Sequence, residues 1–403
     1  MKKKFILAGL LSLFFSLKGQ RKDTVFRKDT VSKFDIEAMY GHYIQDGNNS
    51  AVTGGIGTEK LSVYSPSFKI KRTGTSGNIL SLKTGVDIIT SASTDKIDYI
   101  VSSASIVDAR TYANIAFTTR ENKQLQWTFG TGFSIESDYF SLPFNIGVSH
   151  QSKNRMRTLT SEIQMYSDDL RWGRLNAQAK HHPVKLIYPS ELRYQQWHET
   201  SRRQSLNLKT SWQQIINKRS RMGLFPELTY QNGLLATPFH RVYFTDNSLR
   251  VENLPSQRIK GLLGLKFYRF AGGRTILKNT IDLYADDFGI LAIGLENETA
   301  IKLNYALTLS PYFRVYFQKG SKYFAPYAQH LISDKYYTSD FDLSDFTSYK
   351  AGIGLRYAPY QHLSRKSTFN DIQLRYAFYS RSNGLHAHAL TCVINGLLSK
   401  HKK

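Results

Sequence analysis

Hydrophobic and polar residues alternate along most of this chain, in runs of ten or more residues. In residues 307–317 the odd-numbered positions are leucine, proline, phenylalanine or valine, and the even-numbered positions are polar. Successive side chains of a β-strand point to opposite faces, so the pattern predicts strands with one apolar and one polar face. Strands of about ten residues can cross a bilayer at a tilt. A soluble β-sandwich also alternates, but its strands average about 5 to 6 residues, so we favour a barrel.

The lengths of the connections follow the parity of the strands. The alternation predicts sixteen strands, which begin near Phe34, Thr58, Ile79, Ile106, Gln124, Ser141, Arg157, Ser201, Ser220, Gln257, Arg274, Gly289, Tyr305, Phe346, Thr368 and Leu385. The five long connections all follow odd-numbered strands, at residues 46–57, 94–105, 171–200, 234–256 and 319–345. Transmembrane barrels have short periplasmic turns and long extracellular loops. We therefore predict an all-β fold, a transmembrane antiparallel up-and-down β-barrel of about 16 strands, with both termini in the periplasm.

The N-terminus predicts export. Residues 1–19 have the form of a signal peptide, because a run of lysines precedes an apolar stretch that is too short to span a membrane. Residues 20–33 contain a repeat of Arg-Lys-Asp-Thr-Val and few apolar side chains, which is typical of a flexible lead. We place this lead in the periplasm and expect the barrel at residues 34–403, in the outer membrane of a Gram-negative bacterium.

The formal net charge of +23 does not indicate a nucleic-acid protein, because the basic residues are scattered through strands and loops. The expected partners are outer-membrane lipid and the outer-membrane assembly machinery. The lone Cys392 excludes an intramolecular disulfide. Predicted lumen positions carry both signs of charge, and so indicate no selectivity: Lys209, Lys266, Lys278, Arg314, Arg356 and Arg375, against Asp35, Glu37, Glu162, Asp282, Glu296, Glu298 and Asp371.

The start of the connection at 171–200 is the first candidate site. Asp168 and Asp169 are followed by Arg171 and Arg174, and carboxylates can form bidentate pairs with guanidinium groups. We predict that these four side chains form a charged cluster near the extracellular mouth or just inside it. The alternative, given equal weight, is a surface loop whose charges pair only for packing.

The connection at 234–256 is the second candidate site. Its aromatic and apolar content predicts that it packs on the barrel rim or into the lumen. It contains His240 and Arg241, which we interpret as structural rather than catalytic. The chain has no defined zinc-ligand spacing, no phosphate-binding glycine loop and no complete nucleophile motif. We therefore predict no metal, no cofactor and no enzymatic activity.

Several segments resemble the domain of unknown function 3570 family. They are YIQDGN at 43–48, AVTGGIGTE at 51–59, ITSASTD at 89–95, VDAR at 107–110, DDLRWG at 168–173 and YYTSD at 336–340. The resemblance covers almost the whole mature chain and implies an outer-membrane protein without an established activity, and it supplies no catalytic residues. Members of that family lie near thioredoxin-like proteins and flavin transferases, which points to redox traffic in the envelope for the family and assigns no partner to this chain.

Two functions remain open from the sequence. The first is a passive channel or transport component for small solutes, because roughly sixteen strands enclose a lumen wide enough for them unless loops close it. The alternative is an envelope scaffold or assembly partner of a periplasmic redox or lipoprotein system.

Overall fold

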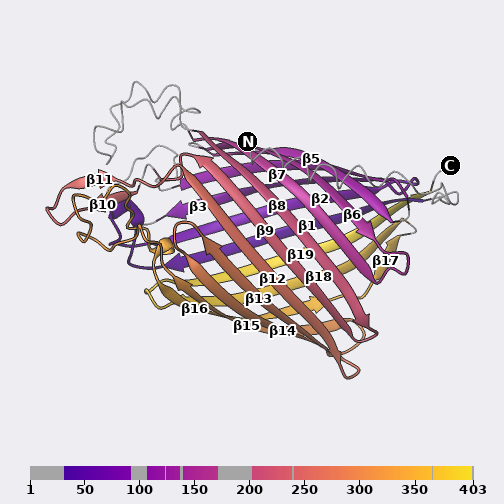
Figure 1. The fold of residues 1–403 in the computed structure, drawn as a ribbon. Coiled ribbons are helices and arrows are strands. Elements are labelled where there is room, and N and C mark those ends of the chain that lie inside the picture. The colour runs from indigo at the N-terminus through magenta and orange to yellow at the C-terminus, as the bar shows by residue number, and fades with distance from the viewer. Residues whose placement is uncertain are drawn as a thin grey trace.

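The computed structural model describes residues 31–91, 107–122, 124–136, 139–170, 202–237, 240–364 and 366–401. Within these residues, sixteen long antiparallel strands form one closed barrel (Figure 1). They are β1 (Val31–Asp46), β2 (Leu61–Thr73), β3 (Ile79–Ser91), β4 (Val107–Arg120), β5 (Leu125–Ile135), β6 (Phe140–Gln151), β7 (Arg157–Asp169), β8 (Arg202–Asn217), β9 (Ser220–Gly233), β12 (Gln257–Ala271), β13 (Thr275–Asp286), β14 (Leu291–Lys302), β15 (Leu307–Lys319), β16 (Phe346–Tyr357), β18 (Ser367–Arg381) and β19 (His386–His401). Each pairs with the next long strand, and β1 closes the barrel against β19. The predicted up-and-down barrel is confirmed.

The predicted strand starts agree with the structure to within three residues. One of the largest differences is at the first strand, which begins at Val31 rather than near Phe34. The cause is the length of β19, because its last three residues pair with the first three of β1. The flexible lead predicted for 20–33 therefore extends too far at its C-terminal end. The predicted signal peptide and residues 20–30 lie outside the described residues.

The alternation places apolar side chains on the outer surface. In β15, Phe313 and Phe317 are 49% and 45% exposed, while Arg314 and Tyr316 line the lumen. Every one of the sixteen strands exposes at least one large hydrophobic side chain in this way. Soluble monomers rarely expose contiguous apolar patches larger than a few hundred Å². An apolar band that surrounds a closed barrel is the lipid-facing surface of an outer-membrane protein.

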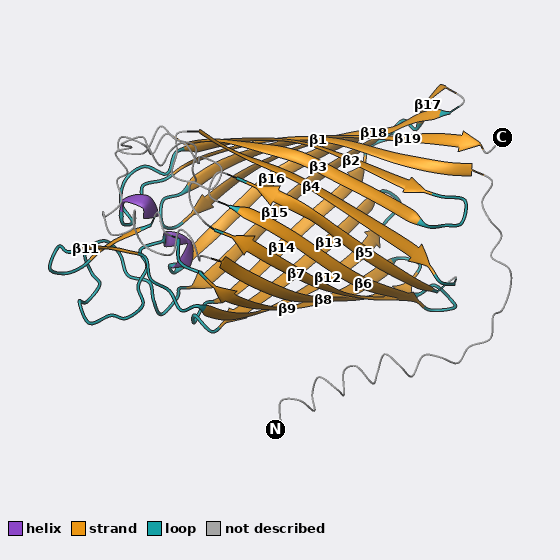
Figure 2. Ribbon diagram, turned by 90° about the horizontal axis from the view of Figure 1, so that it is seen from above, coloured by secondary structure: helices purple, strands orange, loops and turns teal. Residues whose placement is uncertain are grey.

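The described long connections, at 47–60, 234–256 and 320–345, follow the predicted parity and gather at one end of the barrel, opposite the end where β19 finishes (Figure 2). They contain short elements that the alternation did not predict. Two 3-10 turns are η1 (Ala51–Thr53) and η3 (Phe341–Leu343), and β10 (Arg241–Tyr243) pairs with β11 (Leu249–Val251). Among the described residues, no helix is long and apolar enough to cross a membrane. At the short-turn end, β17 (Gln361–Ser364) pairs with the start of β18.

Candidate functional site

The lumen wall formed by β13 to β18 carries a row of charged side chains. Glu298 of β14 accepts hydrogen bonds from Lys278 Nζ at 2.7 Å and from Arg375 Nη2 at 2.8 Å. Lys278 is on the neighbouring strand β13, whereas Arg375 is on β18 and reaches past β15 and β16. The Arg375–Glu298 ion pair therefore follows the circumference of the wall.

A glycine makes this reach possible. The ring of Tyr312 lies over Gly352, where an added Cβ would be 2.3 Å from the ring atom Cζ. The Tyr312 hydroxyl donates to the backbone oxygen of Tyr376 at 3.2 Å, so the ring lies across β16 and contacts β18. The Arg375 guanidinium stacks over that ring, 4.7 Å from its centre. The aromatic ring thus supports the Arg375 side chain from below and orients its guanidinium toward Glu298.

The same wall contains two further ion pairs. Lys350 Nζ lies 3.7 Å from Glu296 Oε2, and Arg314 Nη2 lies 3.6 Å from Asp282 Oδ2. Each carboxylate of the row therefore has a cation within 4 Å. The row consists of four cations, Lys278, Arg314, Lys350 and Arg375, and three carboxylates, Asp282, Glu296 and Glu298. Six of these seven residues are among the thirteen lumen positions predicted from the sequence, and Lys350 is the exception. The wall they form is close to neutral.

A cavity of about 500 Å³ adjoins this row. Its lining includes Glu298, Arg375, Gln373 and Arg356. Arg356 Nη2 donates to Asp371 Oδ2 at 2.9 Å, so this cation is also held along the wall. The cavity presents both signs of charge and an amide, which suits polar solutes better than apolar ones.

At the loop end of β7, Asp168 is buried and has three hydrogen-bond partners, two from the start of β6 and the residue before it and one from β8. It accepts from Ser141 Oγ at 2.6 Å, from the Tyr139 hydroxyl at 3.3 Å and from Arg203 Nε at 2.9 Å. The register of β7 and β8 places Asp168 opposite Arg203. The predicted partners Arg171 and Arg174 lie outside the described residues, so their part in a cluster with Asp168 and Asp169 stays a prediction.

Three of the long loops pack together at the mouth. We call them the loop cap, defined as residues 47–60, 234–256 and 320–345 without Pro238 and Phe239. Phe244 and Val242 are fully buried there, and the Phe244 ring meets the Tyr337 ring edge-on at 4.8 Å. Backbone hydrogen bonds join Asn253 and Tyr337 in both directions. The cap therefore has a small core of its own. The loop at 234–256 was predicted to pack on the barrel rim or into the lumen, and it packs against the loop at 320–345.

The first loop of the cap, at residues 47–60, packs against the other two loops through two glycines. An added Cβ at Gly55 would lie 2.9 Å from the Ser339 backbone oxygen, and one at Gly54 would lie 2.6 Å from the Tyr243 ring. Both glycines have positive φ, at 87° and 86°. Only a residue without a side chain adopts this backbone and this close approach readily.

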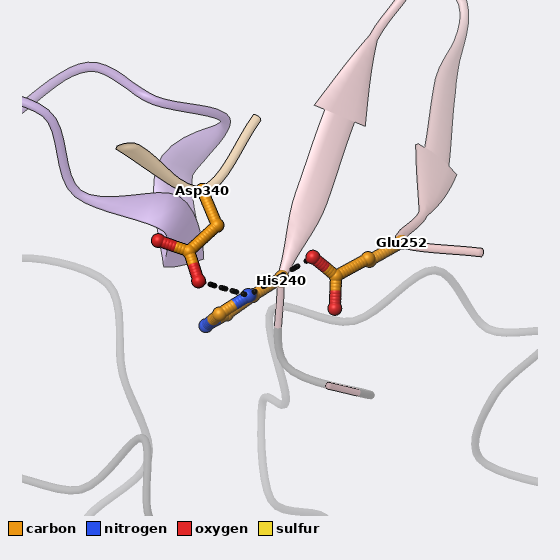
Figure 3. A group of neighbouring side chains, drawn as sticks. All are labelled: His240, Glu252 and Asp340. Carbon is orange, nitrogen blue, oxygen red and sulfur yellow. Dashed lines mark hydrogen bonds and ion pairs between the residues drawn. The ribbon is translucent and has the colours of Figure 1, made fainter. Parts of the chain in front are cut away.

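His240 of the cap meets two carboxylates (Figure 3). Its Nδ1 lies 3.4 Å from Glu252 Oε1 and 3.9 Å from Asp340 Oδ2. Glu252 is only 2% exposed, and it accepts from the Thr237 backbone N–H at 2.6 Å and from the Thr338 hydroxyl. The neighbouring Arg241, predicted from the sequence together with His240, is buried in β10. The sequence had singled out His240 but neither carboxylate.

The pKa values of the three groups show how strongly they interact. Burial lowers the pKa of His240, but the Glu252, Asp340 and Asp342 carboxylates together more than offset this, so the pKa lies above its usual value. Burial raises the pKa of Glu252, yet His240 and the hydrogen bonds from Thr237 and Thr338 bring it below the usual value. Burial raises the pKa of Asp340 to about 6, against the opposing effect of His240. Two carboxylates are thus held around one imidazole.

Comparison with known proteins identifies a family. The family described as protein of unknown function (DUF3570) matches residues 102–388. No curated protein matches the chain. Three of the solved structures that the chain resembles are from Pseudomonas aeruginosa. OccK7 (OpdD) has 7% sequence identity and a TM-score of 0.45, and the match covers 92% of this chain and 98% of that chain. OpdQ has 8% identity, a TM-score of 0.43 and coverage of 91% and 99%, and the outer membrane protein opdK has 8% identity, a TM-score of 0.41 and coverage of 93% and 100%. Similarity at this distance carries no functional argument.

Proposed function

This chain belongs to the DUF3570 family of proteins of unknown function, and we propose from its lumen that it is a passive channel for small polar solutes. The observation that supports the proposal is the paired row of charges along β13 to β18. Because Arg375, Glu298 and Lys278 bind one another along the wall, their side chains present polar groups to the lumen without crossing it.

The near-neutral wall also bears on the class of solute. Rings of one charge make a pore selective for the opposite charge. In this wall each carboxylate is matched by a cation, so we expect weak charge selection and passage of neutral polar solutes.

Liposome swelling tests this function. Folded protein reconstituted into vesicles should allow uptake of small neutral sugars, with a rate that falls steeply as the sugar becomes larger. Vesicles that contain heat-unfolded protein are the control. Folded protein that admits no solute of any size would contradict the proposal.

The loop cap favours a second candidate, an envelope scaffold or assembly partner of a periplasmic redox or lipoprotein system. A cap with a buried core, formed by Val242, Phe244 and Tyr337, covers part of the mouth. A barrel whose mouth is partly covered is less suited to the passage of solutes. Crosslinking in native membranes, followed by purification of the barrel, should then recover one periplasmic protein in a fixed ratio. Recovery of the barrel alone would exclude this candidate.

A further inference from the structure

His240, Glu252 and Asp340 bring three donor atoms together from two loops of the cap. The Nδ1 and two carboxylate oxygens all lie within 4.8 Å of one another. In Figure 3 both carboxylates face the same ring nitrogen of His240. One nitrogen and two oxygens at these separations are a donor set that a divalent cation can use.

The distances leave space between the donors. Asp340 Oδ1 accepts from the Asp342 backbone N–H at 2.9 Å, whereas Oδ2 is 3.9 Å from His240 Nδ1, beyond hydrogen-bond range. No other donor to Asp340 Oδ2 occurs in the part of the chain that the structure describes. Metal–ligand bonds of about 2.1 Å place tetrahedral ligands about 3.4 Å apart, which is the His240–Glu252 separation.

The remaining lone pairs are held by the surrounding structure. Glu252 is fixed by the Thr237 N–H and the Thr338 hydroxyl, and Asp340 by the Asp342 N–H. Such outer hydrogen bonds orient metal ligands and leave the facing lone pairs for the ion.

The charge of the group also matches a divalent ion. With a neutral imidazole, Glu252 and Asp340 give the group a charge of minus two. The next carboxylate, Asp342, is already paired with Arg381. Part of the group is accessible, since the Asp340 side chain is 25% exposed and that of His240 is 19% exposed, so water can complete the coordination and an ion can reach the site.

We propose that His240, Glu252 and Asp340 form a binding site for one divalent transition-metal cation, which joins the loop at 234–256 to the loop at 320–345. The imidazole nitrogen favours a transition metal such as Zn²⁺ over Ca²⁺, which takes six to eight oxygen ligands. The ion connects β11, through the adjacent Glu252, to η3, through the adjacent Asp340, and so stabilises the loop cap.

The test measures metal binding directly and does not depend on conductance. Full-length folded barrel in detergent is stripped with a chelator and titrated with Zn²⁺ by calorimetry. We expect one ion per chain, and we expect Co²⁺ in its place to give the absorption bands of a metal bound by nitrogen and oxygen. Asp340→Asn keeps an oxygen that can accept from the Asp342 N–H but removes a charged ligand, so the affinity for Zn²⁺ should fall at least tenfold.

Two comparisons make the outcome decisive. His362→Ala removes an exposed histidine on β17 and should leave Zn²⁺ binding unchanged. Glu252→Gln should lower the affinity as Asp340→Asn does. Heat-modified migration on gels verifies that each variant is folded. Parent protein that binds neither Zn²⁺ nor Co²⁺ in a 1:1 ratio, or Asp340→Asn that binds as the parent does, would overturn the site.

Discussion

Gly352 determines the shape of the charged lumen wall. Its missing side chain lets the Tyr312 ring lie across β16, and that ring carries the Arg375 guanidinium. A chain with any larger residue at this position would have to lift the ring into the lumen. The Arg375–Glu298 pair therefore depends on a residue that carries no chemistry itself.

Gly352→Ala should accordingly destabilise the barrel and disturb the wall. The new Cβ would lie 2.3 Å from Tyr312 Cζ and 2.4 Å from the Tyr376 backbone oxygen, and crowding of this kind costs about 1 to 3 kcal/mol. Urea unfolding in lipid vesicles measures the change. Gly273→Ala is the matched control, because nothing lies within 4 Å of its added Cβ. Equal stability of the two variants would contradict this reading.

Asp168 gives a second prediction at the level of single residues. Its side chain is only 3% exposed, while that of Arg203 is 28% exposed. Asp168→Ala would leave Arg203 and the Ser141 hydroxyl without their acceptor, which should cost about 3 kcal/mol of unfolding free energy. Arg203→Ala in the Asp168→Ala background should then add little. A double-mutant cycle measures this coupling, and strictly additive losses would show that the pair does not act as a unit.

The charged side chains along β13 to β18 form one row across several strands, and its negative and positive charges can be removed separately by substitution. Glu298→Gln leaves Lys278 and Arg375 unmatched, so the wall becomes more positive and the zero-current potential under a salt gradient should shift toward anion preference. Arg375→Gln should shift it toward cation preference. Lys153→Gln, in an exposed turn between β6 and β7, should shift it in neither direction. Shifts of the same sign from both wall variants would rule out charge control by this row.

The strands themselves were predictable from the sequence, and the contacts between loops were not. A strand such as β15 has a period of two that can be read directly, and its start was predicted to within two residues. The contact of His240 with Asp340 depends on how two loops fold over the mouth, which no local pattern encodes. The only sequence signal for Asp340 is that it ends one of the segments that resemble the family. The ion pair between Arg375 and Glu298 could not be predicted from the sequence either, because it depends on the strand register that places Gly352 beside Tyr312.

The whole molecule has two unlike ends, which predicts its orientation in the membrane. Short turns lie at the periplasmic end of such barrels and long loops lie outside, so we propose that both termini are periplasmic. Epitope tags inserted near Gln178 and Ser333 should be labelled on intact cells, and a tag after Lys403 should be labelled only after permeabilisation. The reverse pattern would invert the barrel.

Single-channel recording in planar bilayers tests the central claim most directly. The claim is that the barrel encloses a conducting, weakly selective lumen. A variant in which residues 240–252 are replaced by a short glycine linker distinguishes the conductance of the lumen from the effect of the loop cap on it. We predict discrete conductance steps with a zero-current potential close to zero under a salt gradient, and larger steps for the variant because part of the cap is removed. Folded parent and folded variant that both give no conductance would contradict the account.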